Sequence, residues 1–230
     1  MRTKLAAIFA ASLLLSPAAM WAAESQAANR LDDAADVMTD MMKTSDKSVP
    51  QDLLNKAECM IIVPGLKKAG FIIGAKYGRG FVLCRHANGV GWSAPAGVRI
   101  EGGSLGFQIG ASEQDLLLLV MNETGMKRLL GNKFTVGAEA TAAAGPVGRD
   151  ASAQTDAVMR AEMLSYSRAR GLFAGISLQG ATLRPDDDTN EELYGKGVSN
   201  KTILTGTVKV PAAAQKLEAL INKNSSRQTK

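Results

Sequence analysis

The sequence predicts an α+β fold, in which a curved, mainly antiparallel sheet or half-open barrel is flanked by N- and C-terminal helices. The first observation is a series of short apolar runs through the middle of the chain, separated by glycine-rich turn signals. The second is helical periodicity on both sides of that series. The third is a pair of glycines four residues apart, which leaves one strand face bare and allows strong curvature. This pair recurs at Gly70–Gly74, Gly106–Gly110 and Gly171–Gly175.

Residues 1–27 have the three-part build of a secretory signal peptide. Arg2 and Lys4 precede an apolar run, and small residues follow it. Cleavage is expected after Ala23 or after Ala27. An uncleaved anchor is the alternative, although the apolar run is short for a membrane span of about 20 residues. The expected destination is periplasmic or secreted. The whole chain has 27 basic and 22 acidic residues, a net charge of +5.

Helices are expected before and after the strands. Apolar residues at helical spacing over Asn29–Lys43 predict an amphipathic helix whose other face carries aspartates. Because an anionic bilayer would repel that acidic face, we expect the helix to pack on the domain. A short helix is expected over Ser48–Lys56 and a last one over Pro211–Lys223. Residues 223–230 are predicted to be a flexible basic tail.

The stretch from Ile61 to Pro95 reads as three strands. Ile61–Val63 is expected to run into a turn at Pro64-Gly65. Gly70–Tyr77 and Gly80–Arg85 are expected to pair across a turn at Gly78-Arg79-Gly80, and Asn88-Gly89 is a strong hairpin signal before the next strand. Further strands are predicted at Asp115–Met121, Phe134–Ala144, Glu162–Arg170 and Leu172–Leu183, and short helices at Asn122–Leu130 and Asp186–Tyr194.

Two cysteines, Cys59 and Cys84, lie on predicted strands. In an oxidising compartment an even pair of cysteines is a candidate disulfide, and the two can meet if their strands pair. The alternative is a pair of buried free thiols, which are common core residues.

Basic residues gather at the glycine turns. Backbone amides in such turns form concavities that favour phosphate, and lysine or arginine adds charge. Each basic residue near an anionic surface contributes about 1 kcal/mol before screening by salt. We therefore expect these cations to share one side of the molecule and bind an anion, whereas the alternative is a solvated basic face. The candidate binding residues are Lys67, Lys68, Lys76, Arg79, Arg149, Arg168 and Arg170.

Catalytic and metal motifs find little support. Gly102–Gly106 matches the G-x-S-x-G pattern of hydrolases, but the single histidine, His86, precedes Ser104 and a strand is expected to follow it. The acidic run Asp186–Glu192 lacks the glycine and the last carboxylate of a calcium loop and is read as a solvated helix start. No catalytic residue, metal ligand or cofactor is predicted. Few aromatics and an exported destination also argue against nucleic acid.

The chain resembles the SYLF domain family over most of residues 57–205, in segments that follow one another in order. These segments are PGLKKAGFIIGAKYGRG (64–80), GWSAPAGVRIEGGSLGFQIG (91–110), DLLLLVMNE (115–123), FTVGAEATAAAGPVGRD (134–150), SYSRARGLFAGISLQGATLRPD (165–186) and ELYGKG (192–197). The resemblance implies a single SYLF-like domain over residues 28–222 and binding of phosphoinositide-like lipids. We therefore expect non-catalytic binding of anionic lipid headgroups at a membrane surface in the cell envelope. The alternative is an envelope structural or protein-interaction module that binds an acidic partner, and the oligomeric state stays open.

Overall fold

The computed structural model describes residues 25–43, 49–71, 73–105, 110–131, 133–136, 141–148, 160–169, 172–176, 178, 180–206 and 208–225. Most of the predicted signal peptide (1–24) and of the basic tail (226–230) lie outside the described residues. Within the described residues, nine strands form one sheet in the order β5-β9-β3-β2-β1-β4-β7-β6, and β8 pairs with β7. β6 runs parallel to β7 and the other pairs are antiparallel, so the sheet is mixed.

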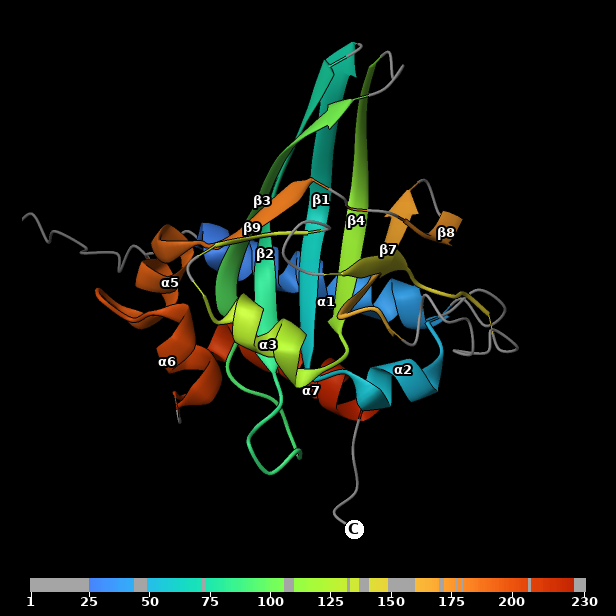
Figure 1. Cartoon of the computed structure of the whole chain (residues 1–230). Coiled ribbons are helices and arrows are strands. Elements are labelled where there is room, and N and C mark those ends of the chain that lie inside the picture. Colours follow the sequence, from blue (N-terminus) through green and yellow to red (C-terminus); the bar gives the residue numbers. More distant parts are fainter. Residues whose placement is uncertain are drawn as a thin grey trace, which may run out of the picture.

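The four central strands are long, and in Figure 1 their paired ends rise well beyond the helices. They are β1 (Cys59–Phe71), β2 (Ile73–Cys84), β3 (Ala96–Leu105) and β4 (Gly110–Val120). The outer strands are β5 (Phe134–Thr135), β6 (Ala142–Ala144), β7 (Met163–Ala169), β8 (Leu172–Gly175) and β9 (Ala181–Pro185). The helical elements are α1 (Gln26–Lys43), α2 (Gln51–Lys56), α3 (Glu123–Leu129), α5 (Asp187–Tyr194), α6 (Asn200–Thr205), η1 (Ala212–Ala214) and α7 (Gln215–Asn224).

The turn expected at Pro64-Gly65 is a bulge inside β1. The registers of β1 with β2 and with β4 both shift there, because β1 carries one extra residue. Gly65 has φ +56°, which favours glycine, and its N–H donates to Asp115 Oδ1 at 3.1 Å. Proline is tolerated at such a point because it has no N–H to offer the ladder. The bulge lets β1 continue to Phe71.

The turn expected at Gly78-Arg79-Gly80 is also wrong, because these residues lie in the middle of β2 and pair with β3. The β1–β2 hairpin instead reverses between Phe71 and Ile73. Gly80 is needed where the bulge of β1 comes close: a Cβ on Gly80 would collide with the carbonyl oxygen of Ile62. The predicted strand Leu172–Leu183 is divided into β8 and β9, and Gly180, with φ +77°, directly precedes β9.

Two hydrophobic clusters lie on opposite faces of the sheet. On the face that we call the α1 face, Phe81, Leu83 and Leu117 pack with buried residues of α1 and α7. On the opposite face, called here the inner face, Leu116 and Val82 pack with residues of α6 and the outer strands. β9 and β7 lie on opposite sides of the central strands and both contribute to the inner cluster, so the sheet curls around this face. The predicted α+β half-open barrel is confirmed.

Helix α1 packs along its face of the sheet, with α7 beside it (Figure 1). Leu31, Met38 and Met41 are fully buried or nearly so, and burial of each such side chain contributes about 1.5–3 kcal/mol. Lys216 of α7 contacts two aspartates on the acidic side of α1. The expectation that this helix packs on the domain is confirmed. None of the helices in the described part of the chain combines the length and the apolar character that crossing a membrane requires.

The base of the central strands carries a disulfide. Cys59 of β1 and Cys84 of β2 are cross-strand partners, and their sulfurs are bonded at 2.01 Å. Both residues are buried. The next residue, Arg85, is buried as well and donates hydrogen bonds to carbonyl oxygens that include those of Ala57 and Ser225. The disulfide therefore joins β1 to β2 at this end of the sheet, and the hydrogen bonds of Arg85 join the same end to α2 and α7.

Candidate functional site

The candidate lysines lie on β1 and β2 beyond the bulge, towards the projecting ends of the strands. Lys67 pairs with Tyr77, and Lys68 pairs with Lys76. Neighbouring residues of a strand point to opposite faces, whereas cross-strand partners share one. Phe81 in β2 faces α1, so Tyr77 and Lys67 lie on the α1 face. Lys68 and Lys76 therefore lie together on the inner face.

The inner face around Lys68 and Lys76 has no acidic neighbour in the register. Lys68 pairs with Ser112 of β4, Lys76 pairs with Gly102 of β3, and Gln114 follows on the same face. Neither lysine has an ion pair in the described part of the chain. Gln114 Nε2 is buried without a hydrogen-bond partner. The arrangement brings two positive charges to one small region, and the buried amide of Gln114 lies beside them on the same face.

Burial and mutual repulsion act on this lysine pair. Burial lowers the pKa of Lys68 below its usual value of 10.5, and the charge of Lys76 lowers it further. Burial also lowers the pKa of Lys76. Holding both ammonium groups on one face therefore has a free-energy cost, which a bound anion would offset.

Arg79 does not join this group, because it is engaged in an ion pair. Its Nε lies 2.5 Å from Asp186 Oδ2, and Nη2 contacts Asp186 Oδ1. Burial raises the pKa of Asp186, but hydrogen bonds from Arg79 and Thr189 and the charge of Arg79 outweigh burial and lower it overall. The acidic run Asp186–Glu192 is a solvated helix start only in part. Asp187 and Asp188 are exposed, but Asp186 is fully buried and ties β2 to the start of α5.

Arg168 is likewise engaged within the protein. Its guanidinium lies 3.1 Å from Asp115 of β4 and 2.8 Å from Asp40 of α1, so it joins three elements. Arg149 and Arg170 lie outside the described residues. Of the seven candidate residues, the described structure brings Lys68 and Lys76 together on one face. It places Lys67 on the other face and holds Arg79 and Arg168 in ion pairs.

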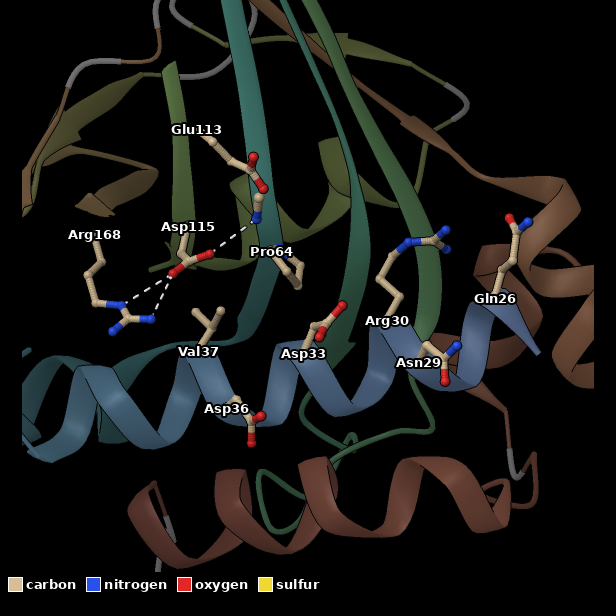
Figure 2. Close-up of a pocket in the computed structure, with 11 residues that line it drawn as sticks. Gln26, Asn29, Arg30, Asp33, Asp36, Val37, Pro64, Glu113, Asp115 and Arg168 are labelled. Carbon is tan, nitrogen blue, oxygen red and sulfur yellow. Dashed lines mark hydrogen bonds and ion pairs between the residues drawn. The ribbon is translucent and has the colours of Figure 1, made fainter. Parts of the chain in front are cut away.

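A cavity of about 560 Å³ lies between α1 and the sheet, and sequence reasoning did not find it. Figure 2 shows its two walls: α1 on one side, and the bulge of β1 with the adjoining part of β4 on the other. Charged residues of both signs come from elements far apart in the sequence, and only the acidic face of α1 was visible as a pattern. The lining residues are Gln26, Asn29, Arg30, Asp33, Asp36, Val37, Pro64, Gly65, Glu113, Asp115 and Arg168.

The rejected enzyme motifs occupy ordinary structural positions. Ser104 lies within β3, paired with Gly74, and not at a strand-to-helix turn. In the described residues no group of three or more His, Cys, Asp or Glu side chains is arranged to hold a metal ion.

Known proteins resemble this chain over most of its length. It is 35% identical to the rat SH3 domain-containing YSC84-like protein 1 over 178 residues, which are 77% of this chain and 52% of that protein. It is 32% identical to Protein YSC84 of Saccharomyces cerevisiae over 176 residues, which are 75% of this chain and 37% of the yeast protein. The chain thus spans about half the length of the mammalian relatives, or less in yeast.

A family model described as "Ysc84: Las17-binding protein actin regulator" matches residues 101–224, which is more than half of the chain. The match begins in β3 and continues to the end of α7. The chain therefore belongs to the Ysc84 family.

Proposed function

We propose that this chain is a non-catalytic binding domain that docks on an acidic partner protein through Lys68 and Lys76. The observation that carries the proposal is that these two cations share the inner face without a carboxylate partner in the described structure. The two candidate arginines that the structure describes, Arg79 and Arg168, are in contrast held by aspartates. Unpaired, partly buried ammonium groups are the ones with most to gain from an incoming carboxylate.

The family supports a protein as the partner. The description of the family names binding to Las17 and regulation of actin, and the names of several relatives describe them as SH3 domain-containing proteins. Those words describe the relatives. For this chain they support a role in protein contact, with the partner recognised by its acidic chemistry.

An extracytoplasmic location agrees with two features of the chain. Cys59 and Cys84 are joined, and disulfides persist in oxidising compartments. Cleavage of the predicted signal peptide after Ala23 would leave α1 whole, whereas cleavage after Ala27 would remove its first two residues. Ala27 is buried, and its N–H donates to Glu192. We therefore favour the first position and a periplasmic or secreted domain.

Anionic lipid headgroups are the second candidate ligand. The close spacing of the nitrogen groups of Lys68, Lys76 and Gln114 favours them. Lys68, Lys76 and the unpaired amide of Gln114 lie within a few positions of one another on adjacent strands. A phosphate group takes several such donors at once, whereas carboxylates on a peptide are more widely spaced. Each lysine near an anionic membrane contributes about 1 kcal/mol.

The test compares two probes on one pair of variants. The first probe is a fluorescein-labelled oligoglutamate peptide, followed by anisotropy, and the second is flotation with phosphatidylcholine vesicles with or without phosphatidylglycerol. The test variant is Lys68→Gln with Lys76→Gln. The control is Lys201→Gln with Lys209→Gln, which makes the same charge change at two exposed residues.

Loss of peptide binding in the test variant alone supports the protein reading. Loss of flotation in the test variant alone, with no affinity for the peptide, supports the lipid reading. Equal losses in both variants would mean that net charge, and not the lysine pair, attracts the probes. Unchanged binding in the test variant would overturn both readings.

A further inference from the structure

We propose that the cavity between α1 and the bulged part of β1 and β4 is a docking site for a basic segment of a partner protein. This site lies on the α1 face, opposite the lysine pair, and prefers the opposite charge. It is therefore separate from the function proposed above.

The cavity has two walls that carry carboxylates. Asp33 projects from α1 and Glu113 from β4, and both are exposed (Figure 2). Neither makes an ion pair in the described part of the chain. Lys67 is the cross-strand neighbour of Glu113 on β1, but no ion pair joins the two. Two unpaired carboxylates on facing walls suit an amine or guanidinium held between them.

The remaining charges of the cavity are engaged by other residues. Arg168 contacts Asp115 and Asp40, as described above. Asp36 lies 3.0 Å from Lys216 of α7. Arg30 donates from Nη1 to Thr189 Oγ1 of α5 at 3.2 Å, which directs its guanidinium away from the β4 wall. Among the carboxylates that line the cavity, those of Asp33 and Glu113 are therefore the ones without an ion pair in the described structure, while the charge of Arg30 is turned towards α5.

An exposed aromatic residue stands near this cavity. Tyr77 is 48% exposed and is one of two large hydrophobic residues exposed in the described structure. It shares the α1 face with Glu113 through the register of β2, β1 and β4. Tyr77 pairs with Lys67, and Lys67 pairs with Glu113, so one strand lies between Tyr77 and the β4 wall of the cavity. Tyrosine and arginine are enriched among the residues that carry most of the binding energy of protein interfaces.

The size and charge of the cavity decide the kind of occupant. A volume of about 560 Å³ admits one or two long side chains and falls within the range of functional pockets. The whole chain has a net charge of +5 and would repel a basic peptide. Attraction of a basic segment must therefore come from the nearby carboxylates of Asp33 and Glu113. Because these two carboxylates are negative and unpaired, a lysine or arginine side chain of the partner is the expected occupant.

The experiment measures binding of a fluorescein-labelled peptide of alternating lysine and serine by anisotropy at low and physiological ionic strength. The test variant is Asp33→Asn with Glu113→Gln, which removes the two charges and keeps the shape. The control is Asp52→Asn with Glu218→Gln, which removes two charges that do not line the cavity. A third variant, Tyr77→Ala, removes the aromatic contact.

We expect the test variant to bind about tenfold more weakly, as two lost charge contacts would predict, and the control variant to bind within about twofold of the parent. Tyr77→Ala should weaken binding about fivefold. The Lys68→Gln, Lys76→Gln variant should bind this peptide as well as the parent, which separates this site from the lysine pair. Unchanged binding in the test variant, or equal loss in test and control variants, would overturn the proposal. A glutamate–serine peptide that bound equally well would also overturn it.

Discussion

Arg85 lies over the ring of Trp92, with its guanidinium carbon 4.4 Å from the ring centroid. The same guanidinium donates to Ala57 O at 2.8 Å and to Ser225 O at 2.7 Å, and Trp92 Nε1 donates to Ser225 Oγ at 3.1 Å. One buried cation thus joins the end of β2 to the ends of α2 and α7 through their carbonyl oxygens.

Arg85→Met should lower the free energy of unfolding by about 3 kcal/mol or more, because several buried carbonyls lose charged donors. Urea denaturation followed by tryptophan fluorescence measures the change. Lys209→Met, an exposed lysine-to-methionine change, should stay within about 0.5 kcal/mol of the parent. An equally small effect of Arg85→Met would show that this network is not needed for stability.

The Cys59–Cys84 bond should contribute about 3 kcal/mol, as expected for a cross-link with a sequence separation of 25. The double variant Cys59→Ala, Cys84→Ala should lose this amount in a urea titration, and reductant should then have no further effect. Because both sulfurs are buried, the parent should be reduced slowly under native conditions and quickly once urea opens the sheet. Rapid reduction of the folded parent would contradict the burial of this bond.

The ion pair of Arg79 and Asp186 predicts a particular response to acid. The folded-state pKa of Asp186 is below its usual value of 3.8, so the carboxylate adds stability above 3.8 and this stability is lost as pH falls through the lower folded-state pKa. Asp186→Asn should remove that part of the pH dependence, measured as unfolding free energy against pH.

Arg79→Met leaves the buried carboxylate of Asp186 without its partner and should cost about 3–5 kcal/mol at neutral pH. The double variant Arg79→Met, Asp186→Asn should be less destabilised than the sum of the single changes. Additive effects would mean that the two side chains do not depend on each other.

The lysine pair also predicts stability that rises with pH, but in the alkaline range, and at neutral pH the pair lowers stability where Asp186 raises it. The pKa of Lys68 is lowered in the folded state, first by burial and then by Lys76, so the folded protein releases this proton at lower pH than the unfolded chain. The cost is present in full at neutral pH and is relieved as pH rises towards 10.5. Lys76→Met should raise the pKa of Lys68 part of the way back, because burial remains. Carbon-13 NMR of the lysine side chains follows this titration, and an unchanged pKa of Lys68 would contradict the proximity of the two amines.

The elements with a clear period could be predicted from the sequence. The N-terminal helix, the start of the short helix at Asn122 and the apolar strand segment within Asp115–Met121 all lie close to where they are expected. The errors are at Pro64-Gly65 and Gly78–Gly80, where glycine and proline are the usual signals of a turn. Here the same residues permit a bulge and a close approach of two backbones, which depend on the neighbouring strand and leave no local signal.

The bulge also limited what could be predicted about the site. One extra residue in β1 breaks strict alternation, so counting in twos from Ile62 puts Lys68 on the α1 face, whereas the structure puts it on the inner face. The partners of Arg79 and Arg168 lie 107 and 53 residues away in the sequence. The sequence therefore shows which basic residues lie near glycines. It does not show which of those residues are held in ion pairs and which remain available to a ligand.

The bond between Cys59 and Cys84 closes the whole β1–β2 hairpin, with Lys68 and Lys76 inside it, into a covalent ring. A protease that cuts any single peptide bond between the two cysteines would therefore leave a two-chain molecule of unchanged mass apart from one added water. The two pieces would separate on a denaturing gel only after a thiol is added. Limited proteolysis followed by gel electrophoresis without reductant would thus show what fraction of the cleaved protein still has the Cys59–Cys84 bond. The same sample run with reductant would show the total fraction that was cleaved.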